Sequence, residues 1–139
     1  MKKNLLTAIC SFLAACFLFS GCIGPGTQDW RLPLADGYEI WRINSEEIVF
    51  GYAEDTSLEV LVDADVTAFF KKDSYIGIRQ SSSENEEESE LYYLFSLEDK
   101  TLSDPLQKAD FEALCSDKGI DFTGWTATRP APDGAVYGN

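Results

Sequence analysis

The feature that most constrains the fold is a series of short apolar runs, rich in β-branched and aromatic residues and separated by turn-forming residues. Six runs follow one another without a helical pattern between them: 38–43, 48–52, 58–62, 66–70, 75–79 and 91–97. Turn signals such as Asp36-Gly37 and Asp63-Ala64-Asp65 separate them. Their spacing, mostly roughly 8–12 residues, is typical of antiparallel strands. The sequence therefore predicts an antiparallel β-meander of about six strands.

One helix is expected after the strands, roughly over residues 108–118, because Phe111, Leu114 and Cys115 recur on one helical face and Gly119 stands at a typical helix end. A single helix against a face or an end of a sheet makes the fold class α+β. We expect one globular domain over 30–122, followed by an extended tail over 123–139. The strand spacing also leaves a small barrel or a propeller-like blade open.

The N-terminal segment resembles a bacterial lipoprotein signal peptide. Lys2 and Lys3 precede a mostly apolar run of about 15 residues, shorter than the roughly 20 that a spanning helix needs. Small residues, Ser20-Gly21, then stand directly before Cys22. The resemblance implies cleavage of residues 1–21, lipidation of the Cys22 sulfur, and a flexible tether over 22–29. Cys16 is the alternative lipidation site, and an ordinary secreted protein cut near Gly21 is a further alternative.

These features predict a lipid-anchored protein on the exported side of the cell envelope, in the outer membrane if the cell has one. Two or three acyl chains anchor a protein stably, whereas a single chain does not.

The rest of the chain resembles a family of small bacterial lipoproteins of unknown function. The family's "LpxGY" start is matched by Leu34-Ala35-Asp36-Gly37-Tyr38, and its "YI" strand before a basic residue and Gln by Tyr75-Ile76-Gly77-Ile78-Arg79-Gln80. Its "GPL…EF" entry to the last helix is matched by Asp104-Pro105-Leu106 and Phe111. Ala35 and Asp104 depart from the Pro and Gly of the family pattern. The resemblance spans roughly 30–120, supports the envelope address and the α+β fold, and implies no site residue.

Cysteine and histidine usage excludes several kinds of chemistry. Of the four cysteines, Cys10 and Cys16 leave with the signal peptide and Cys22 carries lipid, so that Cys115 alone stays free and no internal disulfide can form. We expect Cys115 to be a small buried hydrophobic side chain, with a reactive thiol as the alternative. Because the chain has no histidine, Ser-His-Asp and Cys-His catalysis and histidine-based zinc sites are excluded.

The charge of the chain limits its partners. Cleavage removes Lys2 and Lys3 and no acid, so the 11 basic residues become 9, the 24 acidic residues remain, and the formal charge changes from −13 to −15. Such a charge argues against nucleic-acid binding, which depends on Lys and Arg neutralising phosphates. It is also expected to keep the folded domain off an anionic lipid surface. A protein partner attracted electrostatically is expected to be basic.

Two acidic segments could in principle hold a metal. The run Ser81–Glu90 offers hard oxygens to Ca²⁺, but it lacks alternate spacing and a sharpening glycine, so a solvated hairpin tip is preferred. Asp63 and Asp65 stand two residues apart, but turns favour aspartate for backbone hydrogen bonding. We therefore predict no metal and no cofactor.

A carboxylate pair of the glycosidase type could be formed by Glu46 or Glu47 with Glu54 or Asp55, although nothing in the sequence places them across a cleft. We expect a binding or interaction protein without catalysis, of the immunity or inhibitory type, directed at a basic partner. A carboxylate-using envelope hydrolase is the alternative, and a structural envelope component is a third. Apart from lipidation at Cys22, no site residue is predicted.

Aromatic residues are numerous for a chain of this size. They could form a carbohydrate or peptide platform, but a core without disulfides also needs large side chains, and the core is the preferred interpretation. Tyr92 and Tyr93 share a predicted strand, so they should point to opposite faces and at most one should reach the core. The set comprises Trp30, Trp41, Trp125, Tyr38, Tyr52, Tyr75, Tyr92 and Tyr93.

Overall fold

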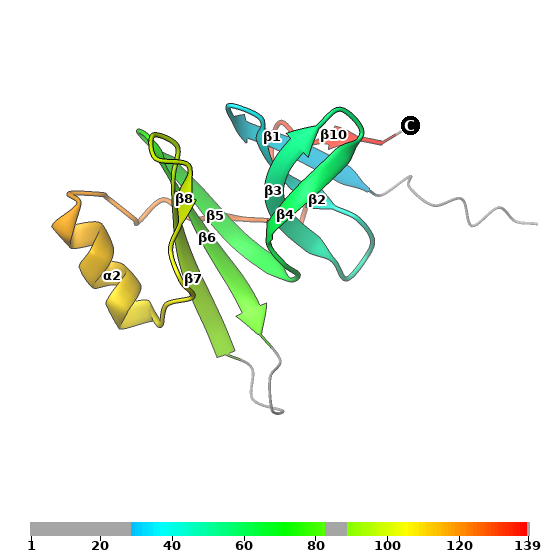
Figure 1. Cartoon of the computed structure of the whole chain (residues 1–139). Helices are drawn as coiled ribbons and strands as arrows, with labels where there is room; N and C mark the ends of the chain where they lie inside the picture. The colour runs from blue at the N-terminus through cyan, green and yellow to red at the C-terminus, as the bar shows by residue number, and fades with distance from the viewer. Residues whose placement is uncertain (1–28, 83–88, 139) are drawn as a thin grey trace, which may run out of the picture.

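The computed structural model describes residues 29–82 and 89–138, which form two antiparallel sheets and one helix, α2 (Figure 1). The first sheet has the order β10-β1-β2-β3-β4 and the second β8-β7-β6-β5-β9. The first comprises β1 (Trp30–Ala35), β2 (Tyr38–Arg42), β3 (Ile48–Glu54), β4 (Ser57–Val62) and β10 (Val136–Tyr137). The second comprises β5 (Val66–Lys72), β6 (Tyr75–Ser82), β7 (Ser89–Ser96), β8 (Thr101–Leu102) and β9 (Thr126–Ala127), and α2 spans Lys108–Asp117. The predicted signal peptide, both candidate lipidation sites and the predicted tether before Asp29 lie outside the described residues.

The predicted class is confirmed in its coarse form, because the described residues are mainly antiparallel β with one helix. The finer prediction of one meander of about six strands is wrong, since the described residues form ten strands in two sheets. All six predicted runs are strands, β2 to β7, but the turn at Asp63–Asp65 does not close a hairpin. It carries the chain from β4 in the first sheet to β5 in the second.

Four strands were missed for identifiable reasons. β8, β9 and β10 have two residues each, too few to show periodicity. β1 contains Pro33, which cannot donate to a sheet ladder. The structure accommodates it because β10 pairs only with Trp30 and Arg31 of β1, so that Pro33 lies where β1 is an edge strand.

Aspartates at positive φ shape the tight hairpins, as the turn signals predicted. Asp36 and Gly37 have φ of 50° and 84° and join β1 to β2. Asp55 and Asp73 have φ of 53° and 50° in the β3–β4 and β5–β6 turns. Aspartate tolerates this left-handed region better than most residues, and it matches the twist of the paired strands.

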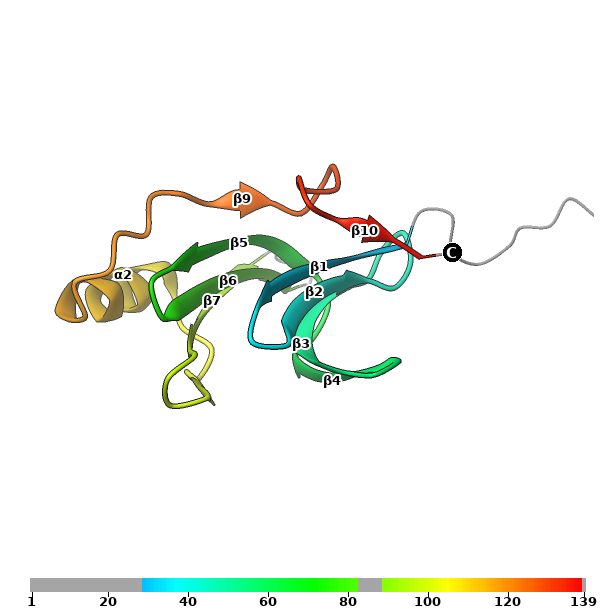
Figure 2. The same ribbon diagram turned by 90° about the horizontal axis from the view of Figure 1, so that it is seen from above.

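The molecule has three layers, with the first sheet packed on one face of the second sheet and α2 on its other face (Figures 1 and 2). The core between the sheets includes Ile40 and Phe50 from the first sheet and Ile78 and Phe95 from the second. The core under the helix includes Phe70, Leu94 and Phe111. Successive residues of one strand therefore enter different cores, as the alternation of side chains along a strand requires.

This layering corrects the prediction for Tyr92 and Tyr93. They do point to opposite faces, but Tyr92 packs in the core under the helix and Tyr93 against the core between the sheets. Both are covered because the second sheet is buried on both faces. The core interpretation of the aromatic residues also holds for Trp30 and Tyr38, which are buried.

A register shift explains why Val60 does not share the burial of Val62. Phe50 pairs with Val62 and the next residue, Gly51, pairs with Val60, which leaves Leu61 as an extra residue on β4. Such a bulge moves the preceding side chains to the other face. Val62 is buried, Leu61 packs against the core, and Val60 is exposed.

The C-terminal tail runs along both sheets (Figure 2). β9 pairs with β5 at the edge of the second sheet, and β10 pairs with β1 at the edge of the first. Between them the buried Thr128 hydroxyl donates a hydrogen bond to the carbonyl of Val66, at 2.8 Å. Residues 126–137 therefore link the edges of the two sheets.

Candidate functional site

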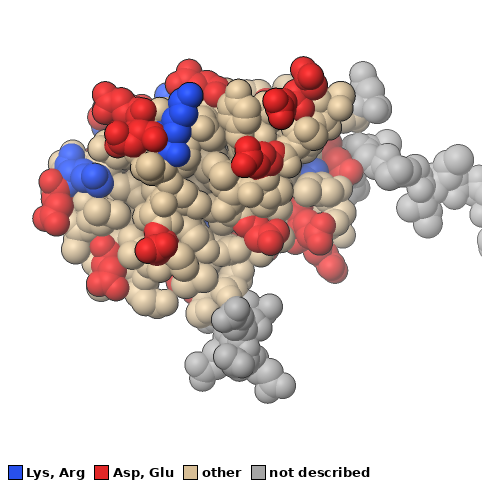
Figure 3. All heavy atoms as spheres, in the orientation of Figure 1, with Lys and Arg blue, Asp and Glu red and all other residues tan. Residues whose placement is uncertain are grey.

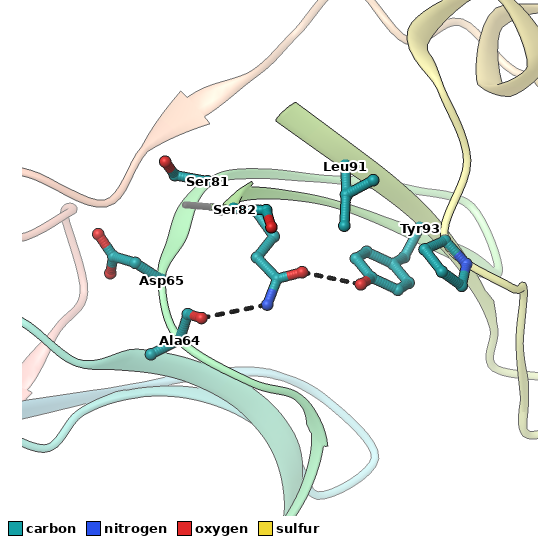
Figure 4. A pocket seen from close by; sticks show the side chains of 8 residues that line it. Ala64, Asp65, Ser81, Ser82, Leu91 and Tyr93 are labelled. Carbon is teal, nitrogen blue, oxygen red and sulfur yellow. Dashed lines mark hydrogen bonds between the residues drawn. The ribbon is translucent and has the colours of Figure 1, made fainter. Parts of the chain in front are cut away.

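A polar groove lies beside the connection between β4 and β5, next to the end of β6 and the start of β7 (Figure 4). Its volume is about 690 Å³. Polar groups come from Asp65, Ser81 and Ser82, while Leu91 and Pro105 supply apolar surface. The full lining is Ala64, Asp65, Gln80, Ser81, Ser82, Leu91, Tyr93 and Pro105.

Gln80 fixes the floor of this groove. Its amide nitrogen donates hydrogen bonds to the carbonyls of Asp63, at 2.9 Å, and Ala64, at 3.2 Å. Its amide oxygen accepts a hydrogen bond from the Tyr93 hydroxyl at 2.8 Å (Figure 4). Burial raises the pKa of Tyr93 above its ordinary value, so the hydroxyl stays protonated at neutral pH. The network joins β6, β7 and the β4–β5 connection beside the groove.

Asp63 and Asp65 do not converge on a common point. The Asp65 carboxylate accepts two hydrogen bonds from the Arg129 guanidinium, at 2.6 and 3.1 Å. The Asp63 carboxylate accepts a hydrogen bond from the backbone amide of Ala64, at 3.3 Å. Across residues 29–82 and 89–138, no three Asp, Glu, Cys or His side chains are grouped so that they could hold a metal ion. The central part of the acidic run Ser81–Glu90 lies outside the described residues.

The carboxylates of the predicted hydrolase pair are far apart. Glu46 and Glu47 stand in the connection before β3, where their amides bond to the Asn44 side chain, each at 2.9 Å. Glu54 is the last residue of the seven-residue β3, at its other end, and Asp55 follows it. A strand of that length spans roughly 20 Å. Paired glycosidase carboxylates need roughly 5–10 Å, so these residues do not form such a pair.

Cys115 is a buried core residue. Its exposed fraction is 0% and it packs with Phe111 under the second sheet. Burial, with a smaller contribution from the negative charge of Glu112, raises the pKa of the Cys115 thiol to about 11. The thiolate that would act as a nucleophile is therefore scarce at neutral pH.

The groove was not predicted from the sequence, although one signal was present. The apolar pattern of 75–79 gives way to Gln80-Ser81-Ser82, whose side chains reach the groove from the end of β6. Tyr93 was singled out for its size and not for its hydroxyl. The partners from the β4–β5 connection are distant in sequence and could not be matched to β6 without the fold.

Comparisons with known proteins give no match: no protein-family model fits the chain, and no curated protein or solved structure resembles it significantly. The resemblance to small bacterial lipoproteins therefore stays a prediction. Within the part of the chain that the structure describes, no helix is long and apolar enough to cross a membrane.

Proposed function

We propose that the chain is a lipid-anchored cell-envelope protein that binds a basic protein partner, as an inhibitory or immunity-type protein would. The observation that carries the proposal is the polar groove. Among the described residues that line it, Asp65 is the one that bears a charge, and exposed Asp63 and Asp104 stand next to lining residues in the chain. A basic side chain would meet the hydroxyls of Ser81 and Ser82 there, and would compete with Arg129 for the Asp65 carboxylate.

The wider surface supports the same partner. Acidic side chains outnumber basic ones on the face shown in Figure 3. A surface with an excess of one sign of charge raises the rate of encounter with an oppositely charged protein, and salt screens the effect. No observation favours the hydrolase alternative, because the candidate carboxylates lie at opposite ends of β3.

The test is retention of a partner by the groove. The full chain, solubilised from membranes, serves as bait for envelope extract at about 50 mM salt, and bound protein is eluted at about 1 M, where the Debye length falls to about 3 Å. Ser82→Arg places a positive charge in the groove and should abolish retention. Ser116→Arg makes the same charge change on an exposed face of α2 and should not.

Two results would refute the proposal. One is the recovery of no protein that high salt releases. The other is equal retention by the wild type and the Ser82→Arg variant.

A further inference from the structure

A second groove lies on the first sheet and has a different character. Its volume is about 520 Å³, and it is formed by β1, β2, β10 and the residues that flank them. Three lining residues are large, apolar and exposed: Ile43 (45%), Val136 (51%) and Tyr137 (56%). In the described ranges, five large hydrophobic residues are exposed, and three of them meet here. We call this surface, with Arg31 and Trp41, the β10 face.

Strand pairing makes the β10 face continuous. Arg31 of β1 is paired with Val136 of β10 on one side and with Trp41 of β2 on the other. Directly paired residues point to the same side of a sheet, so an apolar, a basic and an aromatic side chain stand in one row. Trp41 is half-buried and Arg31 is exposed. The row combines the side chains that proteins place at the level of lipid head groups.

The chain also enters the described structure at this face. Asp29 lines the groove, and its carbonyl accepts a hydrogen bond from the Gly138 amide at 3.0 Å. Figures 1 and 2 show β10 and the start of β1 side by side, at the end of the molecule away from α2. Cys22 precedes Asp29 by seven residues, a span of at most about 25 Å. A lipid on Cys22 would therefore keep the β10 face close to the bilayer.

We propose that the β10 face rests on the bilayer that carries the lipid anchor, with Trp41 and Val136 at head-group level and Arg31 beside lipid phosphates. Tyr137 pairs with the buried Trp30 and therefore lies at the rim of this face, on the other side of the strand from Val136. This inference rests on the proposed anchoring at Cys22. Because the anchor already holds the domain at the membrane, binding of the β10 face to lipid is intramolecular, and a weak attraction between them is sufficient. Asp29 lines this groove and the Glu39 carboxylate accepts a hydrogen bond from the Trp41 indole, so the attraction has to come from Arg31 and the apolar side chains. The rest of the acidic surface is repelled by anionic lipid, which favours this face over the others. The inference revises the expectation that the whole folded domain stays off the membrane.

Quenching of tryptophan fluorescence by brominated lipid tests the orientation. The full-length protein, purified from membranes, is reconstituted into phosphatidylethanolamine–phosphatidylglycerol vesicles whose acyl chains carry bromine near the glycerol end. Wild-type fluorescence should be quenched relative to vesicles without bromine, and Trp41→Phe should remove that quenching. Val136→Asp should remove it as well, whereas Val60→Asp, at a similarly exposed valine of β4, should keep it.

Two separate readouts distinguish docking of the β10 face from lipid anchoring at Cys22. Incorporation of labelled palmitate, lost in Cys22→Ala, reports the anchor by itself. A lipidated protein without quenching, or with quenching that survives Val136→Asp, would overturn the docking while leaving the anchor intact. A protein without lipid would overturn both. A dimer in detergent that Val136→Asp dissociates would assign the β10 face to a second copy and also overturn the docking.

Discussion

Phe95 packs between the two sheets, and its replacement by Ala should lower the free energy of unfolding more than most single changes. The side chain belongs to β7 of the second sheet and is 1% exposed. Its ring lies 4.4 Å from the Tyr38 ring and 5.7 Å from the Phe50 ring, centroid to centroid, and both partners belong to the first sheet. A buried Phe→Ala change costs about 3–5 kcal/mol. A domain of this kind has a stability of about 5–15 kcal/mol, so Phe95→Ala should remove a large share.

Urea denaturation followed by circular dichroism measures this loss. With a slope of about 2 kcal/mol/M, a loss of about 4 kcal/mol lowers the unfolding midpoint by about 2 M. Val60→Ala, at an exposed valine, is the control and should change the free energy of unfolding by less than about 0.5 kcal/mol.

A double-mutant cycle of Tyr38→Leu and Phe95→Leu isolates the contact between the sheets, because an aromatic pair contributes about 0.5–1.5 kcal/mol beyond its burial. A coupling energy below about 0.3 kcal/mol would refute packing of the sheets through this ring pair.

Two further predictions concern the helix and the tail. The Cys115 thiol should resist alkylation at pH 8 in the native protein and react once urea unfolds it, and rapid native labelling would contradict its burial. Folding raises the pKa of the Cys115 thiol from 9.0 to about 11. The protonated thiol therefore stabilises the folded protein fully below pH 9, and this stabilisation is lost between pH 9 and 11. The free energy of unfolding of the wild type, relative to that of Cys115→Ala, should fall over that range. Thr128→Val should lower the free energy of unfolding by about 1–3 kcal/mol, because the Val66 carbonyl loses a buried donor, while Thr126→Val at an exposed position of β9 should have little effect in the same urea assay.

The strands were predictable because local patterns decide them. Asp36-Gly37 marks a tight turn by its own backbone preference, and Ile76 and Ile78 alternate with smaller or polar residues in a way that fixes the buried face. The division into two sheets was not predictable in this way. Asp63-Ala64-Asp65 has the composition of the neighbouring hairpin turns, and only packing between distant strands makes it a crossing from one sheet to the other.

The candidate site was less predictable than the fold because its parts are far apart in sequence. Gln80 meets Asp63 and Ala64 across 16 or 17 residues, and Arg129 meets Asp65 across 64. A search for spaced carboxylates instead selected acidic residues near the two ends of β3, which are too far apart to act as a catalytic pair. A pattern of residues that are close in sequence predicts a strand, because a strand is local structure. A site consists of groups from distant parts of the sequence, and only folding brings them together.

The two proposed surfaces can operate at the same time. The polar groove is built on the second sheet and the β4–β5 connection, the β10 face on the first sheet, and the two share no lining residue. A domain that rests on lipid through the β10 face would thus keep the polar groove free for a partner. Arg129 pairs with Asp65 at the groove, and residues 130–135 run from it to β10, so one segment of the tail adjoins both surfaces. Because the tail runs along both sheets, a change in it, such as Thr128→Val, is expected to disturb the polar groove and the β10 face together.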